Sequence, residues 1–331
     1  MRIDVGAARN LFERLPRQLR LASLSPDYVL ADTGRLSGSQ PLFWRYEEGE
    51  RFWYHGFHLT PLPEVDGFDI QSPYGYGGPL ANTEDADFLA RAWRAYCDMA
   101  TATGVAAEFV RFHPLAGNAG FFGGSIEENR QTVWIDLTAG DLFSQYQGRG
   151  RTTIRKAQAA GVRFEWQDAP AHAARFAEFY RAGMSALDAA PYYRFPDRYF
   201  SAMADWPCVR LGVCSLDEQW LAAGLFLQGA EVVEYHLAAS SGAGKRLGAG
   251  SLLLHAAASS AQIEGFRRLY LGGGTDCSAA NPLYFYKSGF SPHRAVFYIG
   301  THCHDAARQE RLRRRWPQLH RANPERLLFY R

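Results

Sequence analysis

The order of apolar segments in the second half of the chain restricts its fold more than any other feature. Three successive runs read as strands with tight polar turns between them, at 208–216, 219–228 and 231–240. A glycine-containing loop, KRLGAG (245–250), precedes a helix at 251–265, and a strand at 266–273 opens into GGGTD. A short helix and turn at 281–290 and a last strand at 294–300 follow. This order predicts an α+β fold with a mixed, mostly antiparallel sheet flanked by helices.

The first half repeats this order less regularly. Aromatic-rich strands are expected at 41–47, 51–59 and 67–73, followed by a Gly/Pro turn cluster, a helix that ends at Gly104 and a strand at 105–115. We therefore expect two tandem lobes, residues 1–137 and residues 138–304. A basic C-terminal segment, residues 305–331, is expected to pack back on the first lobe.

Composition excludes several classes of protein. The 331 residues carry a net charge of only +2, which argues against a protein that coats DNA. No apolar run approaches the roughly 20 residues of a membrane span, and the first 15 residues lack an apolar signal core, so we expect a cytoplasmic protein. The five cysteines form no CxxC pair. His302 and His304 could share one side of a strand, but no second ligand pair follows at helical spacing, so no metal is expected.

Three glycine-rich or basic segments could carry chemistry. KRLGAG could bind phosphate at the start of a helix, or it could be a flexible turn. LGGGTD (271–276) would let a ligand approach the backbone closely, and Lys287 lies between aromatic residues that would partly desolvate it. Basic residues of GRGRTTIRK suit a polyanion such as RNA, although such clusters are also typical of solvated surfaces. The candidate residues for tRNA or phosphate are Arg151, Arg155, Lys156, Lys245, Arg246, Gly248 and Gly250.

With these segments placed, the chain resembles the Fem family, the aminoacyl-tRNA-dependent transferases that build peptidoglycan bridges, and their GNAT-like relatives. The resemblance rests on SPYGYGGPL, WIDLTAGDLFSQYQGRGRTTIRKAQAAGV, EYHLAASSGAGKRLGAGSLLLHAAASSAQIEG and LYLGGGTDCSAANPLYFYKSGF, in that order. It covers roughly residues 65 to 305 and implies two GNAT-like lobes with a cleft between them. The coiled-coil arm of some members has no counterpart here, because no long heptad run is present.

The resemblance also implies the reaction and the residues that serve it. An aminoacyl group would pass from aminoacyl-tRNA to an amine acceptor, a peptidoglycan precursor peptide or a small metabolite, with no further cofactor. Lys287 and Asp276 would be catalytic, Lys287 and backbone N–H groups near Tyr235 stabilising the developing charge. Asn82 stands where one Fem subgroup has an acidic residue discussed as a base. The substrate-binding candidates are Tyr74, Tyr76, Asn82, Tyr235, Gly273, Gly274, Thr275 and Tyr286.

Two other functions stay open at this point. KRLGAG favours an acyl-CoA-dependent N-acyltransferase of the GNAT type, in which acyl-CoA would replace tRNA as the carrier. A non-catalytic binding module that keeps the fold is the second alternative, to which Asn82 gives weight. The sequence does not identify the donated group, the acceptor or the oligomeric state.

Overall fold

The computed structural model describes residues 1–35, 38–278, 280–315, 327–328 and 330. The chain forms two compact units: residues 1–129 with 297–331, and residues 130–296. Both boundaries fall inside strands, β7 (Ser125–Asp136) and β13 (Arg294–Cys303), rather than at the expected positions near 138 and 304. The charged stretch at 125–130 continues β7, which explains why apolar patterning alone placed the start of this strand later.

The first unit contains a sheet in the strand order β1-β2-β3-β4-β6-β13, with β5 paired to β3. Neighbouring strands in this sheet pair antiparallel, except that β4 and β6 pair parallel. Its remaining elements are β1 (Arg2–Ile3), α1 (Val5–Glu13), α2 (Pro26–Thr33), β2 (Gln40–Glu48), β3 (Arg51–Pro61), β4 (Phe68–Gln71), β5 (Leu80–Ala81), α3 (Ala86–Thr103), β6 (Val105–Arg111) and α11 (Ala306–Arg315). The helices α1 and α2 were not expected from the sequence.

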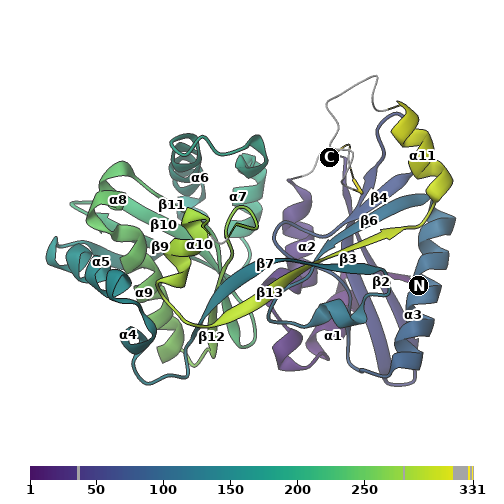
Figure 1. The fold of residues 1–331 in the computed structure, drawn as a ribbon, viewed down its shortest axis with the longest axis horizontal. Helices are drawn as coiled ribbons and strands as arrows, with labels where there is room; N and C mark the ends of the chain where they lie inside the picture. Colours follow the sequence, from purple (N-terminus) through teal and green to yellow (C-terminus); the bar gives the residue numbers. More distant parts are fainter. Residues whose placement is uncertain (36–37, 279, 316–326, 329, 331) are drawn as a thin grey trace. The chain divides into compact units, whose positions relative to one another are not determined.

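Helix α3 covers one face of this sheet (Figure 1). Asp85 caps its first turn, Gly104 ends it in the left-handed conformation, and Phe88, Ala92, Tyr96 and Ala100 form its buried stripe. The C-terminal helix α11 contributes Leu312 to a cluster with Leu62 and Ala106, within the same unit. The rest of the expected C-terminal segment, residues 316–326, 329 and 331, lies outside the described residues.

The second unit contains a sheet in the order β7-β12-β11-β10-β9-β8, in which only β11 and β12 pair parallel. Its other elements are α4 (Leu142–Gln145), α5 (Gly148–Ala159), β8 (Arg163–Gln167), α6 (Ala169–Ser185), α7 (Asp197–Ala204), β9 (Val209–Leu216), β10 (Gln219–Gln228), β11 (Val232–Ser240), α8 (Gly242–Leu247), α9 (Ala249–Ile263), β12 (Arg268–Gly272) and α10 (Pro282–Ser288). The three expected strands at 208–240 are confirmed, as is the helix of 281–290.

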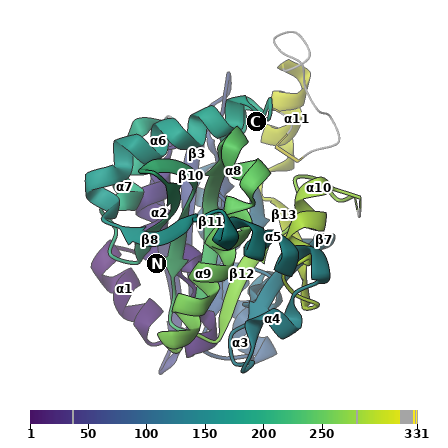
Figure 2. The ribbon, with the colours of Figure 1, turned by 90° about the vertical axis from the view of Figure 1, so that its left-hand side faces the viewer.

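The core of the second unit lies between the sheet and helices α5 and α9 (Figure 2). Ile154 and Ala157 of α5 meet Leu253 and Leu254 of α9 in this core. Helix α6 contacts β11. A β-carbon on Gly183 of α6 would lie 2.7 Å from Cβ of Ala239, so this contact has no room for a side chain at position 183. The predicted fold class, α+β with a mostly antiparallel sheet and flanking helices, is therefore confirmed. No helix among the described residues is long and apolar enough to span a membrane.

Candidate active site

The strands β11 and β12 pair over only a short stretch, and this creates the most distinctive feature of the second unit. Val232, Val233 and Glu234 are the residues of β11 that pair with β12. Beyond them a register shift occurs against β10, where Phe226 lies opposite Tyr235 and Leu225 opposite Leu237. His236 is therefore the extra residue of a β-bulge, a device that redirects a strand and ends its pairing.

A pocket of about 410 Å³ lies beside the diverging end of β11. Residues from β11, α5, α6, α8, α9 and α10 surround it, so segments distant in sequence converge on one concave site. Its lining residues are Thr153, Gly183, Met184, Leu187, Tyr235, Ala238, Ala239, Ser240, Gly244, Lys245, Gly248, Gly250, Ser251, Leu283 and Tyr286. Five of these are residues that the sequence singled out: Tyr235, Lys245, Gly248, Gly250 and Tyr286.

The segment KRLGAG forms the junction of two helices, so the expected loop at 245–250 was wrong. Ser241 caps α8 by accepting a hydrogen bond from the backbone N–H of Gly244, and α8 ends at Leu247. Gly248 has a φ of +80° and separates α8 from α9. A β-carbon on Gly248 would lie 2.5 Å from Cγ2 of Thr153, so this glycine serves both the backbone turn and the close approach of α5.

Two tyrosines line the pocket. Burial raises the pKa of Tyr235 and of Tyr286, and a hydrogen bond between Tyr286 and Ser251 offsets part of the latter shift. A β-carbon on Gly250 would lie 3.4 Å from the Tyr286 hydroxyl, which places this hydroxyl next to the first turn of α9. Both phenols are thus protonated at neutral pH and can donate a hydrogen bond or a proton.

Lys287 lies on α10 but does not line the pocket. Its ammonium group donates a hydrogen bond to the carbonyl oxygen of Gly273, at 2.9 Å, and burial lowers its pKa to about 7. Arg130 donates to the next carbonyl, that of Gly274, at 2.8 Å. Two basic side chains therefore donate hydrogen bonds to successive carbonyl groups of the glycine loop, which fixes the path of the chain after β12.

Asn281 organises the rest of this glycine loop. Its amide oxygen accepts hydrogen bonds from the backbone N–H groups of Leu283 and Tyr284, and its amide nitrogen donates to Thr275 Oγ1 and to Asp276 Oδ2. Asp276 is exposed, and a hydrogen bond from the backbone N–H of Ser278, with the bond from Asn281, lowers its pKa. Asp276 is therefore an ionised carboxylate at the surface of the loop.

The candidate basic residues differ in the contacts that their side chains make and in their exposure. Arg151 donates to the backbone carbonyls of Phe143 and Tyr146, so it helps to anchor α4 against α5. The guanidinium of Arg155 lies 5.7 Å from the centre of the Phe143 ring, and its side chain is exposed. Lys156, Lys245 and Arg246 are exposed as well, and Lys245 reaches the pocket from the last turn of α8.

The remaining candidates, Tyr74, Tyr76 and Asn82, lie in the first unit. The backbone N–H of Tyr74 donates to Asp32, and its carbonyl accepts a hydrogen bond from the Tyr28 hydroxyl. The Tyr76 ring packs edge-on against His113, with centres 4.6 Å apart. The Asn82 amide accepts from the Phe52 N–H and donates to the Glu50 carbonyl, so it ties β5 to β3; its expected contact with substrate stays a prediction.

Sequence reasoning missed several residues of the pocket and its surroundings. Ser240 and Ser251 flank the α8–α9 junction, and a β-carbon on Gly244 would lie 1.9 Å from the carbonyl oxygen of Leu221. Ser241, a residue type that favours helix N-caps, lies just before the expected loop at 245–250, but no helix was expected there. Gly183 and Met184 of α6 gave no signal, because their role depends on how that helix packs against β11.

Comparison with protein families gives one match in this region. Residues 144–288 match the acetyltransferase (GNAT) domain family. This range holds the bulged strand β11, the α8–α9 junction and the pocket. Comparison with curated proteins gives no match.

Several solved structures resemble most of the chain. FemX matches with a TM-score of 0.66 and 12% identity, over 90% of this chain and 96% of FemX. The C-terminal domain of a putative lysylphosphatidylglycerol synthetase from Agrobacterium fabrum matches with a TM-score of 0.60 and 14% identity, over 90% and 92%. L-PGS from Bacillus licheniformis matches with a TM-score of 0.59 and 12% identity, over 93% and 95%. The chain thus shares its fold with FemX and these two synthetase structures, and residues 144–288 match the acetyltransferase (GNAT) domain family.

Proposed function

We propose that this acyltransferase moves an aminoacyl group from aminoacyl-tRNA to an amine acceptor and so forms an amide bond. The observation that carries the proposal is the pocket at the diverging end of β11, where Tyr235, Tyr286 and Lys245 converge. Support for the aminoacyl donor comes from the resemblance to the Fem family and from the shared fold with FemX and a lysylphosphatidylglycerol synthetase. The acceptor would be a peptidoglycan precursor peptide or a small metabolite that bears an amine.

The anionic carrier would lie along the exposed basic residues beside the pocket. Lys245 reaches the pocket, Arg246 follows it on α8, and Arg155 and Lys156 are exposed on α5. Helices α5 and α8 contact each other, and Thr153 of α5 meets Gly248 at the end of α8. Phosphate groups attracted to this surface would direct the acyl end of the donor into the pocket.

The chemistry needs an amine, an activated carbonyl and donors for the developing charge. The amine nitrogen forms a bond to the carbonyl carbon, and the carbonyl oxygen becomes an oxyanion that backbone N–H groups of β11 near Tyr235 would stabilise. The bond to the carrier oxygen then breaks, and the leaving oxygen takes a proton. We assign Tyr286 as the donor of that proton, with the proton lost by the amine restoring it.

Lys287 and Asp276 enter the proposal as residues of the glycine loop. Because Lys287 is bonded to the Gly273 carbonyl and lies outside the pocket lining, we assign it to positioning the loop that leads into α10, which carries Tyr286. Asp276, ionised and exposed, could attract the ammonium form of the acceptor. Gly273 and Gly274 have no side chains and Thr275 has a small one, so the acceptor would be able to approach the backbone of this loop closely.

An acyl-CoA-dependent N-acyltransferase is the second candidate. The match of residues 144–288 to the acetyltransferase (GNAT) family favours it, and Lys245 with the first turn of α9 would then hold the pyrophosphate. The reaction would be the same, except that a carbon–sulfur bond would break and the thiol would take the proton. A non-catalytic binding module is the third candidate, since Asn82 has a structural role in joining the end of β5 to β3.

Binding measurements on the full chain distinguish the three candidates. Purified protein is incubated with mixed aminoacyl-tRNA or with acetyl-CoA, and hydroxylamine serves as a general amine acceptor in a transfer assay. Salt-sensitive retention of tRNA that weakens in Lys245→Ala and Arg155→Ala, with transfer, is expected. The exposed Arg163 on β8 gives the matched control variant, Arg163→Ala. Retention of acetyl-CoA alone would favour the second candidate, and retention of either donor without transfer the third.

A further inference from the structure

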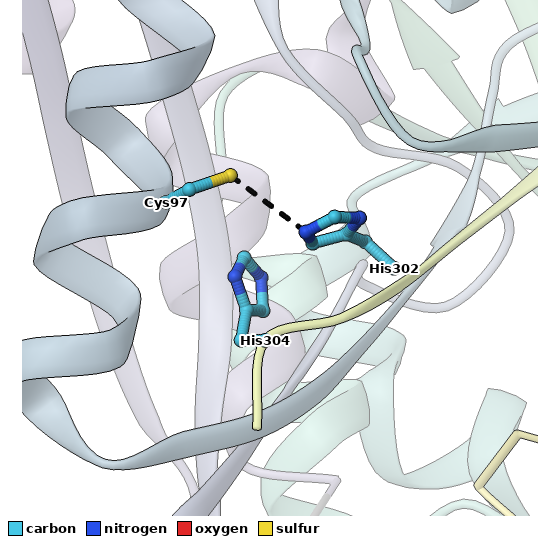
Figure 3. A group of neighbouring side chains, drawn as sticks. All are labelled: Cys97, His302 and His304. Carbon is cyan, nitrogen blue, oxygen red and sulfur yellow. Dashed lines mark hydrogen bonds between the residues drawn. The ribbon is translucent and has the colours of Figure 1, made fainter. Parts of the chain in front are cut away.

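A group of side chains that could bind a metal lies in the first unit, whereas the pocket described above belongs to the second. Cys97 comes from α3, His302 from the end of β13, and His304 from the residues just after that strand (Figure 3). One potential ligand atom from each residue lies within 4.8 Å of the other two. The Cys97 sulfur is 3.8 Å from Nε2 of His302, close to the roughly 3.6 Å that a thiolate and an imidazole span on a tetrahedral zinc ion.

The environment of His304 also indicates a bound cation. Its side chain is fully buried, and its Nδ1 has no hydrogen-bond partner among the described residues. Its Nε2 lies 3.2 Å from Oε2 of Glu108. Because a carboxylate accepts a hydrogen bond, it fixes the proton on Nε2 and leaves a lone pair on Nδ1, directed away from Glu108. A buried lone pair without a donor is costly unless a cation meets it.

Glu108 has the properties of an outer ligand of a metal site. Its side chain is fully buried, and one carboxylate oxygen lies 3.2 Å from Nε2 of His304. The second carboxylate oxygen lies 2.9 Å from Nε2 of His55. A carboxylate that orients a ligating histidine through its second ring nitrogen is a recurrent partner of zinc sites.

The surroundings favour a soft, compact cation. The ring centre of Trp93 lies 5.2 Å from that of His302, and the ring centre of Tyr96 lies 5.9 Å from that of His304, so aromatic rings border both histidines. One sulfur and two imidazole nitrogens suit zinc better than calcium or magnesium, which prefer oxygen ligands.

We propose that Cys97, His302 and His304 Nδ1 bind one zinc ion in the first unit, with Glu108 orienting His304. Binding replaces the thiol proton of Cys97 by the metal, so one proton is released per ion bound. Three protein ligands leave a fourth position for water or another small ligand. The sequence-based expectation of no metal placed His302 and His304 together but lacked a third ligand, since Cys97 is 205 residues away in the chain.

Cobalt substitution tests the proposal directly on the full chain. Metal-free protein is titrated with Co²⁺, whose thiolate charge-transfer and d–d absorption bands report sulfur coordination and tetrahedral geometry. One equivalent of Co²⁺ with both bands, displaced by one equivalent of Zn²⁺, is the expected result. If the charge-transfer band is absent, or if the protein does not bind one equivalent of the metal, the assignment is overturned.

Cys303 supplies a matched control, because it is adjacent to two of the ligands yet exposed. The charge-transfer band should vanish in Cys97→Ser and persist in Cys303→Ser, and the reverse pattern would also overturn the site. Glu108→Gln should retain the band and weaken zinc binding about 10- to 100-fold, as loss of an outer partner does. If Cys97→Ser fails to fold by circular dichroism, His302→Ala takes its place and must lose tetrahedral Co²⁺ binding. All readouts are independent of transferase activity.

Discussion

The ammonium nitrogen of Lys287 lies 2.9 Å from the carbonyl oxygen of Gly273 and donates a hydrogen bond to it. The residue is only 7% exposed, and burial lowers its pKa to about 7. A single carbonyl dipole offsets part of the cost of removing the charge from water. The folded protein therefore holds this proton less tightly than the unfolded chain, where a lysine titrates near pH 10.4.

This difference predicts how the free energy of unfolding depends on pH. Below about pH 7 Lys287 is charged in both states, so the full cost of burying the charge is present. Between about pH 7 and 10.4 the unfolded chain binds more protons than the folded protein, so the free energy of unfolding rises with pH. The contribution of Lys287 to this slope reaches at most about 1.4 kcal/mol per pH unit.

Urea unfolding of the wild type and of Lys287→Met across this pH range measures the effect. The difference between the two free energies should change with pH, because methionine has no proton to lose. Lys156→Met replaces an exposed lysine and should follow the wild type at every pH. Parallel curves for the wild type and Lys287→Met would contradict a lowered pKa.

Much of the fold could be predicted from apolar patterning. Strands β9, β10 and β11 carry continuous apolar runs bounded by turn residues, and Gly104 and Gly265 end helices where glycine signals placed those ends. The first helices were missed because α1 and α2 are short. Which of their faces is buried, as shown by Leu11 and Tyr28, depends on packing against the rest of the unit. The unit boundaries were displaced because β7 and β13 each belong to both units.

The candidate site could be predicted in part. The pattern near 245–250 pointed to Lys245, Gly248 and Gly250, which do line a pocket, but it did not reveal that Gly248 is a contact point for α5. Lys287 was singled out for its aromatic neighbours, whereas the direction of its ammonium group depends on the path of the loop at 272–276. Contacts such as those of Asn281 arise only when both segments are folded.

The hydroxyl group of Tyr286 should control the chemical step. If it protonates the leaving group, Tyr286→Phe should lower the transfer rate to hydroxylamine by roughly 10²- to 10⁴-fold while donor affinity changes little. Since burial raises the pKa of this phenol, the rate should not fall through its ionisation at pH values below 10. Single-turnover measurements with bound donor separate the chemical step from binding.

Tyr284 provides the control for that experiment. It lies on the same helix, and its hydroxyl accepts a hydrogen bond from Arg294 rather than lining the pocket. Tyr284→Phe should transfer at the wild-type rate. Equal rates for Tyr286→Phe and the wild type would remove Tyr286 from the reaction.

The donor should need the pocket beside β11 in order to bind. Ala238 lines the pocket and is half-buried, so Ala238→Phe should fill part of the 410 Å³ and weaken donor binding more than about tenfold. Because the added ring enters open space, the unfolding midpoint should change little. Ala174→Phe adds the same ring to an exposed position of α6 and should leave binding unchanged. Unimpaired binding by Ala238→Phe would place the donor elsewhere.

The junction of α8 and α9 should tolerate no side chain at Gly248. Its φ of +80° disfavours any residue with a β-carbon, and that carbon would meet Cγ2 of Thr153 at 2.5 Å and its carbonyl oxygen at 2.7 Å. Strain and overpacking together should lower the free energy of unfolding by about 2–4 kcal/mol in Gly248→Ala. Gly140 has no atom within 4 Å of an added β-carbon, so Gly140→Ala serves as the matched control in the same urea titration. A midpoint of Gly248→Ala equal to that of the control would mean that α5 yields at Thr153 without cost, and that the α8–α9 junction does not depend on a close helix contact.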